Sequence, residues 1–184
     1  MVETASRKTK YRLDQAQHLA ASIIAELSPG CDRIEVAGST RRKKPEVGDL
    51  EIVAIPKRAK DLFGQDAGSM LDPILEALQE AGRFERIKSG EKYKQFMIVR
   101  AGVCLDLFLV TPATWGLQMA LRTGPVEFSM RLVRQRSRGG FLPEDWHVDG
   151  ATLWNEYGTM VQAPEERDVF EAIGLGWIEP WDRQ

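Results

Sequence analysis

Two segments carry apolar residues at the three- and four-residue spacing of an amphipathic helix. Residues 11–27 form the first segment, which Ser28-Pro29-Gly30 ends, and residues 70–81 form the second, which Gly82 ends. Their apolar stripes are Leu13, Ala16, Ala20, Ile23, Ile24 and Leu27 in the first, and Leu71, Ile74, Leu75 and Leu78 in the second. We expect a helix over each segment.

Short apolar or alternating runs predict strands at residues 33–37, 48–55, 94–100 and 103–110, and we expect a loop over residues 57–69. This order of helices and strands, with no internal repeat, predicts an α/β (α+β) fold built on one mixed sheet.

Beyond a boundary near residues 111–125, the pattern predicts a second, smaller region. Its expected elements are helices at 113–122 and 126–138, a hairpin around Asp149-Gly150, and a last helix that begins at Pro164-Glu165-Glu166.

The strand at 48–55 contains an unusual pair of acids. Alternation puts Asp49 and Glu51 on one face, about 7 Å apart, and Leu50 and Ile52 on the other. Two neighbouring carboxylates in an apolar strand repel each other and usually need cations nearby. A solvent-facing strand with acidic outer positions explains the pair alone, but less well with Gly-Ser-x-Arg-Arg just upstream.

Composition narrows the classes of protein only slightly. The chain has 184 residues, 43% of them hydrophobic and 28% charged, as in an ordinary globular protein. We expect a cytoplasmic protein without a signal peptide or membrane span, because no apolar stretch is long enough for either. Two cysteines, Cys31 and Cys104, are too few for a disulfide framework.

Charge is distributed unevenly along the chain. Residues 143–184 carry ten acidic and two basic residues, a net charge of −8, whereas residues 1–142 carry a net charge of +6. Basic residues gather in four clusters: Arg7, Lys8, Lys10 and Arg12; Arg41 to Lys44; Lys88, Lys92 and Lys94; and Arg131, Arg134, Arg136 and Arg138. Such clusters suit a polyanion lying across one side of the molecule, although each alone can be a solvated charged face.

A third acid, Asp106, lies in the apolar strand CLDLFLV and also needs a partner. Three carboxylates on two strands can hold two divalent cations that serve phosphoryl transfer. Gly38 allows close approach of backbone to a phosphate, Ser39 can donate to its oxygens, and Arg42 can grip them in a fork.

With these residues, GSTRRKKPEVGDLE resembles the Gly-Ser-x-Arg-Arg…Gly-Asp-x-Asp signature of family X DNA polymerases, the DNA polymerase beta-like nucleotidyltransferases. The resemblance continues through CLDLFLV and RTGPVEFS and ends at DVFEAIGLGWIEPWDR, which is similar to the end of the family's thumb. It implies a palm of residues 1–115 with a mixed sheet flanked by helices, and a small α+β thumb of residues 116–184.

The resemblance also implies a function. It is templated addition of dNMP to a primer 3′-hydroxyl with release of pyrophosphate, on primer-template or gapped DNA and as short-gap filling in repair. The cofactor would be two Mg²⁺ ions, which Mn²⁺ can replace. We expect a monomer that synthesises distributively, in the cytoplasm, nucleoid or a viral factory. Because the sequence leaves no room for a lyase domain or a helix-hairpin-helix clamp before residue 12, we expect a miniature, viral or phage-type member with weak DNA affinity.

Roles for single residues follow from the resemblance. Asp49, Glu51 and Asp106 would ligate the metals, with Asp106 acting as, or beside, the base. The nucleotide would be bound by Gly38, Ser39, Arg42, Thr123, Gly124, Phe128 and Ser129, with a further phosphate contact from Arg7 or Lys8. DNA would be bound by Lys92, Lys94, Arg131 and Arg134, whereas Arg41, Lys43 and Lys44 either bind DNA or form a solvated loop.

Several positions depart from the family pattern. Glu51 replaces the usual Asp, and metal binding is expected to survive this change. Arg122, with Leu121, stands where an aromatic pair often checks the sugar, so discrimination against ribonucleotides is in doubt. Ser129 replaces an Asn that reaches the nucleotide. Cys104 replaces a basic residue that often orients the third Asp, which a small hydrophobe cannot do.

Two other classes of function remain open. Non-templated nucleotidyl transfer, to a nucleic-acid end or another acceptor, would use the same acids and Gly38-Ser39, although the thumb and the TGPVEF turn count against it. A non-catalytic DNA-binding subunit could keep the fold, although the retained acids count against that.

Overall fold

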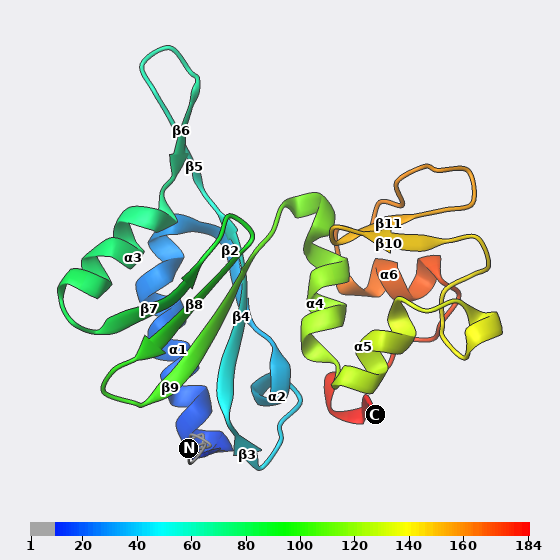
Figure 1. The fold of residues 1–184 in the computed structure, drawn as a ribbon, viewed down its shortest axis with the longest axis horizontal. Helices are drawn as coiled ribbons and strands as arrows, with labels where there is room; N and C mark the ends of the chain where they lie inside the picture. The colour runs from blue at the N-terminus through cyan, green and yellow to red at the C-terminus, as the bar shows by residue number, and fades with distance from the viewer. Residues whose placement is uncertain (1–9) are drawn as a thin grey trace, which may run out of the picture.

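The computed structural model describes residues 10–184 of the chain. These residues form two parts that lie side by side, with helix α4 (Trp115–Thr123) between the sheet of the first part and the rest of the second (Figure 1). The mixed α+β architecture confirms the predicted fold class. Among the described residues, no helix has both the length and the apolar character that a membrane crossing requires.

Five strands form the central sheet. Their spatial order is β2 (Cys31–Val36), β4 (Asp49–Pro56), β9 (Val103–Leu109), β8 (Tyr93–Ile98) and β7 (Phe84–Ser89). β4 and β9 are parallel, and every other neighbouring pair is antiparallel. The long connection that a parallel pair requires consists of β5 to β8, with helix α3 (Leu71–Glu80) among them.

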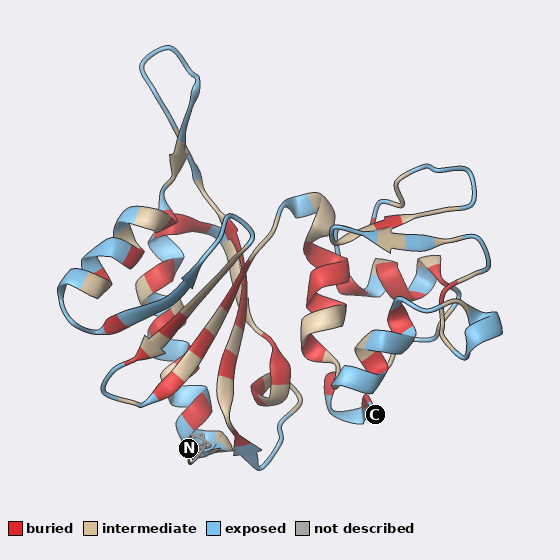
Figure 2. Ribbon diagram, viewed as in Figure 1, coloured by how far each residue is buried: buried red, intermediate tan, exposed pale blue. Residues whose placement is uncertain are grey.

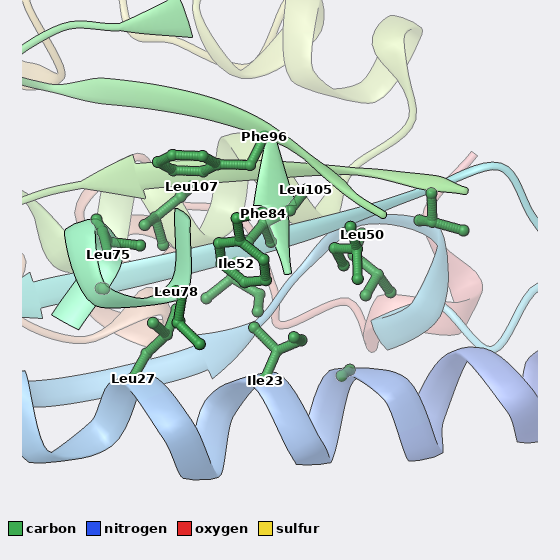
Figure 3. Close-up of a cluster of buried hydrophobic side chains, with 14 of the residues drawn as sticks. Ile23, Leu27, Leu50, Ile52, Leu75, Leu78, Phe84, Phe96, Leu105 and Leu107 are labelled. Carbon is green, nitrogen blue, oxygen red and sulfur yellow. The ribbon is translucent and has the colours of Figure 1, made fainter. Parts of the chain in front are cut away.

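One face of the sheet is covered by α1 (Leu13–Leu27) and by α3. Leu50 and Ile52 from β4, and Leu105 and Leu107 from β9, pack there against both helices (Figure 3). Successive side chains point to opposite faces, so Leu50 and Ile52 share this face, as the sequence predicts. This cluster is the main core of the molecule (Figure 2).

The opposite face of the sheet packs against α4. Val53 and Phe108 from the sheet contact Trp115 and Met119 from the helix in a second buried cluster. The odd positions of β4 and the even positions of β9 therefore face α4, and the candidate acids belong to this face.

The second part has its own core, which the other side of α4 helps to form. Helices α5 (Val126–Leu132) and α6 (Glu166–Ala172) pack with a hairpin of β10 (His147–Asp149) and β11 (Thr152–Trp154). The predicted hairpin is confirmed, since Asp149 pairs with Thr152 across a two-residue turn.

Two predictions for residues 57–93 are wrong. The expected loop contains an antiparallel hairpin, β5 (Arg58–Lys60) with β6 (Asp66–Ser69), which projects from the sheet (Figure 1). Strand β7 was also not predicted. In both segments most side chains are exposed, so the apolar alternation that marks a half-buried strand is absent.

The predicted helix over residues 126–138 is shorter than expected. α5 ends at Leu132, and Gln135 then forms an isolated bridge with Leu142. The remaining short elements are β1 (Tyr11–Arg12), which pairs with β3 (Glu46–Val47), the four-residue helix α2 (Gly38–Arg41), and 3₁₀ turns at Ser28–Gly30, Pro112–Thr114, Arg136–Arg138 and Pro180–Asp182.

Candidate active site

The three candidate acids lie on the face of the sheet that is turned toward α4. Asp49 and Glu51 are on β4 and Asp106 is on β9. In the parallel register Glu51 pairs directly with Asp106, and Asp49 pairs with Cys104. Since residues paired across a sheet point to the same side, the two strands bring the three carboxylates into one neighbourhood.

The surroundings of Glu51 hold its pKa above the usual range of a carboxyl group. Burial, and then the negative charges of Asp49 and Asp106, raise the pKa of Glu51 to about 7, against the opposing charges of Arg42 and Arg122. Burial and the neighbouring carboxylates thus favour the protonated form of Glu51, and an added cation would favour its ionisation.

The donor set fits a hard divalent cation. Carboxylate oxygens are the ligands that Mg²⁺ prefers, and the acids repel one another in a way that a cation would relieve. Within residues 10–184, however, no three His, Cys, Asp or Glu side chains stand at the spacing of an assembled metal site. Asp49, Glu51 and Asp106 are the acids of this face that could hold a metal, and their side chains would have to move to do so.

Asp106 is held by the neighbouring strand β8. Its Oδ1 accepts hydrogen bonds from the Tyr93 hydroxyl at 2.6 Å and from Gln95 Nε2 at 2.8 Å. Tyr93 in turn stacks on Phe108, with ring centroids 5.2 Å apart. Burial, followed by the bond to Asp106, holds the pKa of Tyr93 above its usual range, so this hydroxyl is a donor at any working pH.

The glycine at the start of α2 approaches Glu51 closely. Gly38 has a φ of +61°, and a Cβ atom at this position would lie 1.9 Å from Glu51 Oε2. Only glycine satisfies both conditions. The loop that carries Ser39 is therefore held against the carboxylate strand.

Next to this glycine lie polar atoms without an internal partner. Ser39 Oγ and Arg42 Nε are buried and have no hydrogen-bond partner among the described residues. Buried polar groups are normally satisfied, so such atoms indicate a missing ligand or water. Both are donors and lie near the acids, which fits the expected binding of phosphate oxygens.

The sequence left two roles open for Arg41, a contact with DNA or a place in a solvated loop. The structure shows neither, because the side chain is largely buried and makes contacts within the protein. Its guanidinium donates to Thr123 Oγ1 at 2.6 Å and to Glu166 Oε2 at 2.7 Å. Glu166 also accepts from Arg183 Nη1 at 2.6 Å. Arg41 thus joins α2 to the second part of the molecule. Lys43 lies over the ring of Trp181 at 3.9 Å, and Lys44 is exposed.

The residues expected to touch the nucleotide differ in accessibility. Phe128 is buried against Phe141 and Phe170, so its expected contact with the nucleotide is corrected to a packing role. The Thr123 side chain is also fully buried, and its carbonyl accepts from Arg42 Nη1 at 2.6 Å.

Two further residues of this group lie at the turn between α4 and α5. Gly124 caps α4, where a Cβ would lie 2.6 Å from the ring of Phe128. Ser129 donates to the carbonyl of Leu121 at 2.6 Å. The sharp turn predicted at Thr123-Gly124 is therefore present, and close packing holds it in place.

The expected DNA-binding residues lie on different faces. Lys92, Arg131 and Arg134 are exposed. Lys94 instead pairs with Asp72 of α3 at 3.3 Å, on the face of the sheet opposite the acids. This position does not favour its expected role in tracking a DNA strand, because alternation along β8 turns it toward α3. Arg7 and Lys8, the other expected phosphate ligands, lie outside the described residues.

Two polar residues at the site were not predicted from the sequence. Tyr93 and Gln95 donate hydrogen bonds to Asp106, and only the register of the strands brings them there. Arg122, which the sequence placed near the sugar, lies over the Phe108 ring at 4.0 Å, and its charge lowers the pKa of Glu51.

Comparison with known proteins finds two similarities. Residues 120–184 match the family model described as DNA polymerase beta thumb. The chain is also similar to DNA polymerase lambda of Rattus norvegicus, at 24% identity over 163 residues, which cover 79% of this chain. It spans 28% of the length of that relative.

The described fold and these comparisons define a protein similar to family X DNA polymerases. The thumb match covers the C-terminal third of the chain, and the weaker similarity to DNA polymerase lambda extends over most of its length.

Proposed function

We propose that the protein is a DNA-directed DNA polymerase that adds dNMP to a primer 3′-hydroxyl and releases pyrophosphate. The observation that carries the proposal is the coincidence of two sites. The carboxylates of Asp49, Glu51 and Asp106 lie on one face, and the buried, unpaired donors of Ser39 and Arg42 lie beside them.

Different residues of the site would have different roles in an in-line phosphoryl transfer. When bound, two Mg²⁺ ions, or Mn²⁺ in their place, activate the primer hydroxyl and neutralise charge on the transferring phosphoryl group. Asp49, Glu51 and Asp106 would hold them. Ser39 Oγ and the Arg42 guanidinium would donate to the oxygens of the outgoing pyrophosphate and orient the triphosphate for attack.

We further propose that residues 1–115 act as the palm and residues 116–184 as the thumb. The exposed arginines Arg131 and Arg134, with Lys92, would contact the phosphates of a primer-template or gapped duplex. Arg131 and Arg134 are on the second part and Lys92 is on the first, so DNA would contact both parts. We also propose that the protein works as a monomer.

Extension of a one-nucleotide gapped duplex tests the proposal. The protein is incubated with Mg²⁺ and each dNTP singly, and insertion dictated by the template is the expected result. Asp106→Ala should abolish extension, whereas Asp149→Ala, which removes an exposed acid from the distant hairpin, should not. Extension by Asp106→Ala at the parent's rate would refute the site assignment.

Other outcomes identify the competing functions. Addition that ignores the template indicates a non-templated nucleotidyltransferase, and DNA binding without extension indicates a non-catalytic subunit. Parallel reactions with rNTPs measure sugar discrimination, which we expect to be weak because Arg122 stands at a position that often carries an aromatic residue.

A further inference from the structure

The strand that carries Asp106 offers nothing to orient its carboxylate. The neighbours on the same face of β9 are Cys104 and Phe108, a small thiol and an aromatic ring. Neither is a strong hydrogen-bond donor. A metal-binding carboxylate that is not held in place loses rotamer entropy on binding and competes poorly for the ion.

The next strand supplies the missing donors. The antiparallel register places Gln95 directly opposite Asp106, and Tyr93 opposite Phe108. Both side chains reach the same atom, Asp106 Oδ1, at 2.6 Å from the Tyr93 hydroxyl and 2.8 Å from Gln95 Nε2. No donor from residues 10–184 forms a hydrogen bond with Oδ2 of the same carboxylate. Rotation of the carboxylate would break both hydrogen bonds to Oδ1. The two bonds therefore hold the carboxylate in one orientation and leave Oδ2 as the oxygen available to a cation.

Packing holds the tyrosine donor in position. The Tyr93 ring stacks on Phe108, with 27° between the planes, and Phe108 is buried in the cluster that contains Trp115 of α4. The guanidinium of Arg122 lies over the same Phe108 ring. The direction of the hydroxyl is thus set by a packed aromatic side chain rather than by a mobile one.

We propose that Tyr93 and Gln95 are positioning residues that hold Asp106 with Oδ2 directed toward the metal. This inference rests on the proposed function, in which Asp106 is a metal ligand. The two side chains would act through Asp106, as the outer-shell partners of other metal ligands do, and would not touch the substrate themselves. Under the competing explanation, Tyr93 only fills space and Gln95 only satisfies a half-buried carboxylate.

Two near-isosteric variants separate these explanations. Tyr93→Phe keeps the ring stacked on Phe108 and removes only the hydroxyl, and Gln95→Met keeps the length of the side chain and removes the amide. The matched control is Tyr157→Phe, which makes the same chemical change at an exposed tyrosine. Thermal unfolding of each variant first establishes that it is folded.

The first measurement is Mn²⁺ affinity, by titration with paramagnetic detection and without DNA or nucleotide. We expect each positioning variant to bind Mn²⁺ about 10-fold more weakly than the parent, and Tyr157→Phe to be unchanged. The second is single-nucleotide insertion, in which kcat should fall about 10-fold with little change in the KM for dNTP, because Ser39 and Arg42 are intact.

The outcomes are distinguishable. If folded Tyr93→Phe and Gln95→Met bind Mn²⁺ as tightly as the parent, or if the parent binds none, the positioning role is overturned. If the parent inserts no nucleotide but the two variants still weaken Mn²⁺ binding, the positioning role stands and the proposed polymerase function fails. If insertion proceeds at the parent's rate in both variants, the function stands and the positioning role fails.

Discussion

Replacing Glu166 with glutamine should destabilise the protein far more than the loss of a surface ion pair. The Glu166 carboxylate accepts from Arg41 at 2.7 Å and from Arg183 at 2.6 Å. The Arg183 side chain is 0% exposed and that of Glu166 is 7% exposed. Glutamine offers one acceptor oxygen, and its NH₂ group faces a guanidinium that cannot accept a hydrogen bond.

The expected loss in the free energy of unfolding follows from the burial of this ion pair. Removing one partner of a buried ion pair costs about 3–5 kcal/mol, because the other charge is left without compensation. Burial already lowers the pKa of Arg183 in spite of Glu166, so this cation depends on its partner. Arg183 also donates to the carbonyl of Ile178 at 3.0 Å, which favours the lower end, about 3 kcal/mol. For a chain of this length, that corresponds to a Tm lowered by about 6–12 °C.

Urea and thermal unfolding, followed by circular dichroism, measure this loss. The control is Asp66→Asn, which removes the partner of Arg58 in an ion pair whose side chains are 55% and 58% exposed. That change should cost far less stability, because solvent screens both charges of this exposed pair. If Glu166→Gln costs no more than Asp66→Asn, the buried pair contributes no more than a surface pair and the reasoning is wrong.

Three further predictions concern the candidate site. Gly38→Ala should abolish extension and lower stability, since its Cβ would lie 1.9 Å from Glu51 Oε2, whereas Gly48→Ala, whose Cβ meets nothing within 4 Å, should do neither; equal activities would contradict the described loop. Glu51→Gln should remove metal-dependent activity yet stabilise the metal-free protein at pH 8. Because burial raises the pKa of Glu51 from 4.5 to about 7, the parent loses stability as the pH rises between these values. The variant should therefore gain up to about 3 kcal/mol at pH 8 and nothing near pH 4, as measured by urea unfolding at both values. Lys94→Ala should leave the affinity for gapped DNA unchanged, whereas Arg134→Ala should weaken it and reduce the slope of log affinity against log salt by about 1, as measured by fluorescence anisotropy; the reverse result would place DNA on the α3 face.

The elements predicted best from the sequence are those that bury many apolar side chains. Helices α1 and α3 show apolar stripes because each packs one face against the core, and β4 and β9 show short apolar runs because helices cover both faces of the sheet. The β5–β6 hairpin and β7 leave most of their side chains exposed. Backbone pairing forms them with little apolar burial, so their sequences carry almost no periodic signal.

At the candidate site, the sequence predicts what depends on one strand and does not predict what depends on the pairing of several strands. Alternation alone predicts that Asp49 and Glu51 share a face, because that property is local to one strand. The pairing of Glu51 with Asp106, and of Asp106 with Gln95, depends on the register of three strands from distant parts of the chain. Local pattern does not specify register, and Tyr93 and Gln95 were missed for that reason.

Arg41 shows how a local motif can mislead. Four consecutive basic residues suggest a surface that binds polyanions, but the partner of Arg41 is Glu166, which lies 125 residues later in the chain. A run of basic residues predicts only the local charge. Whether one of its side chains is buried and paired depends on residues from distant parts of the chain.

The two arginines at the end of α2 link this helix to the second part of the molecule. Arg41 reaches Thr123 and Glu166, and Arg42 Nη1 donates to the carbonyl of Thr123 at 2.6 Å. One edge of the Arg42 guanidinium is thus occupied by the bond to Thr123, whereas its buried Nε has no partner among the described residues. A lysine in its place could not both hold the end of α4 and present a second edge to an anion. If the proposed function holds, the donors that grip the triphosphate are thus attached directly to the thumb, and a movement of the thumb would move them.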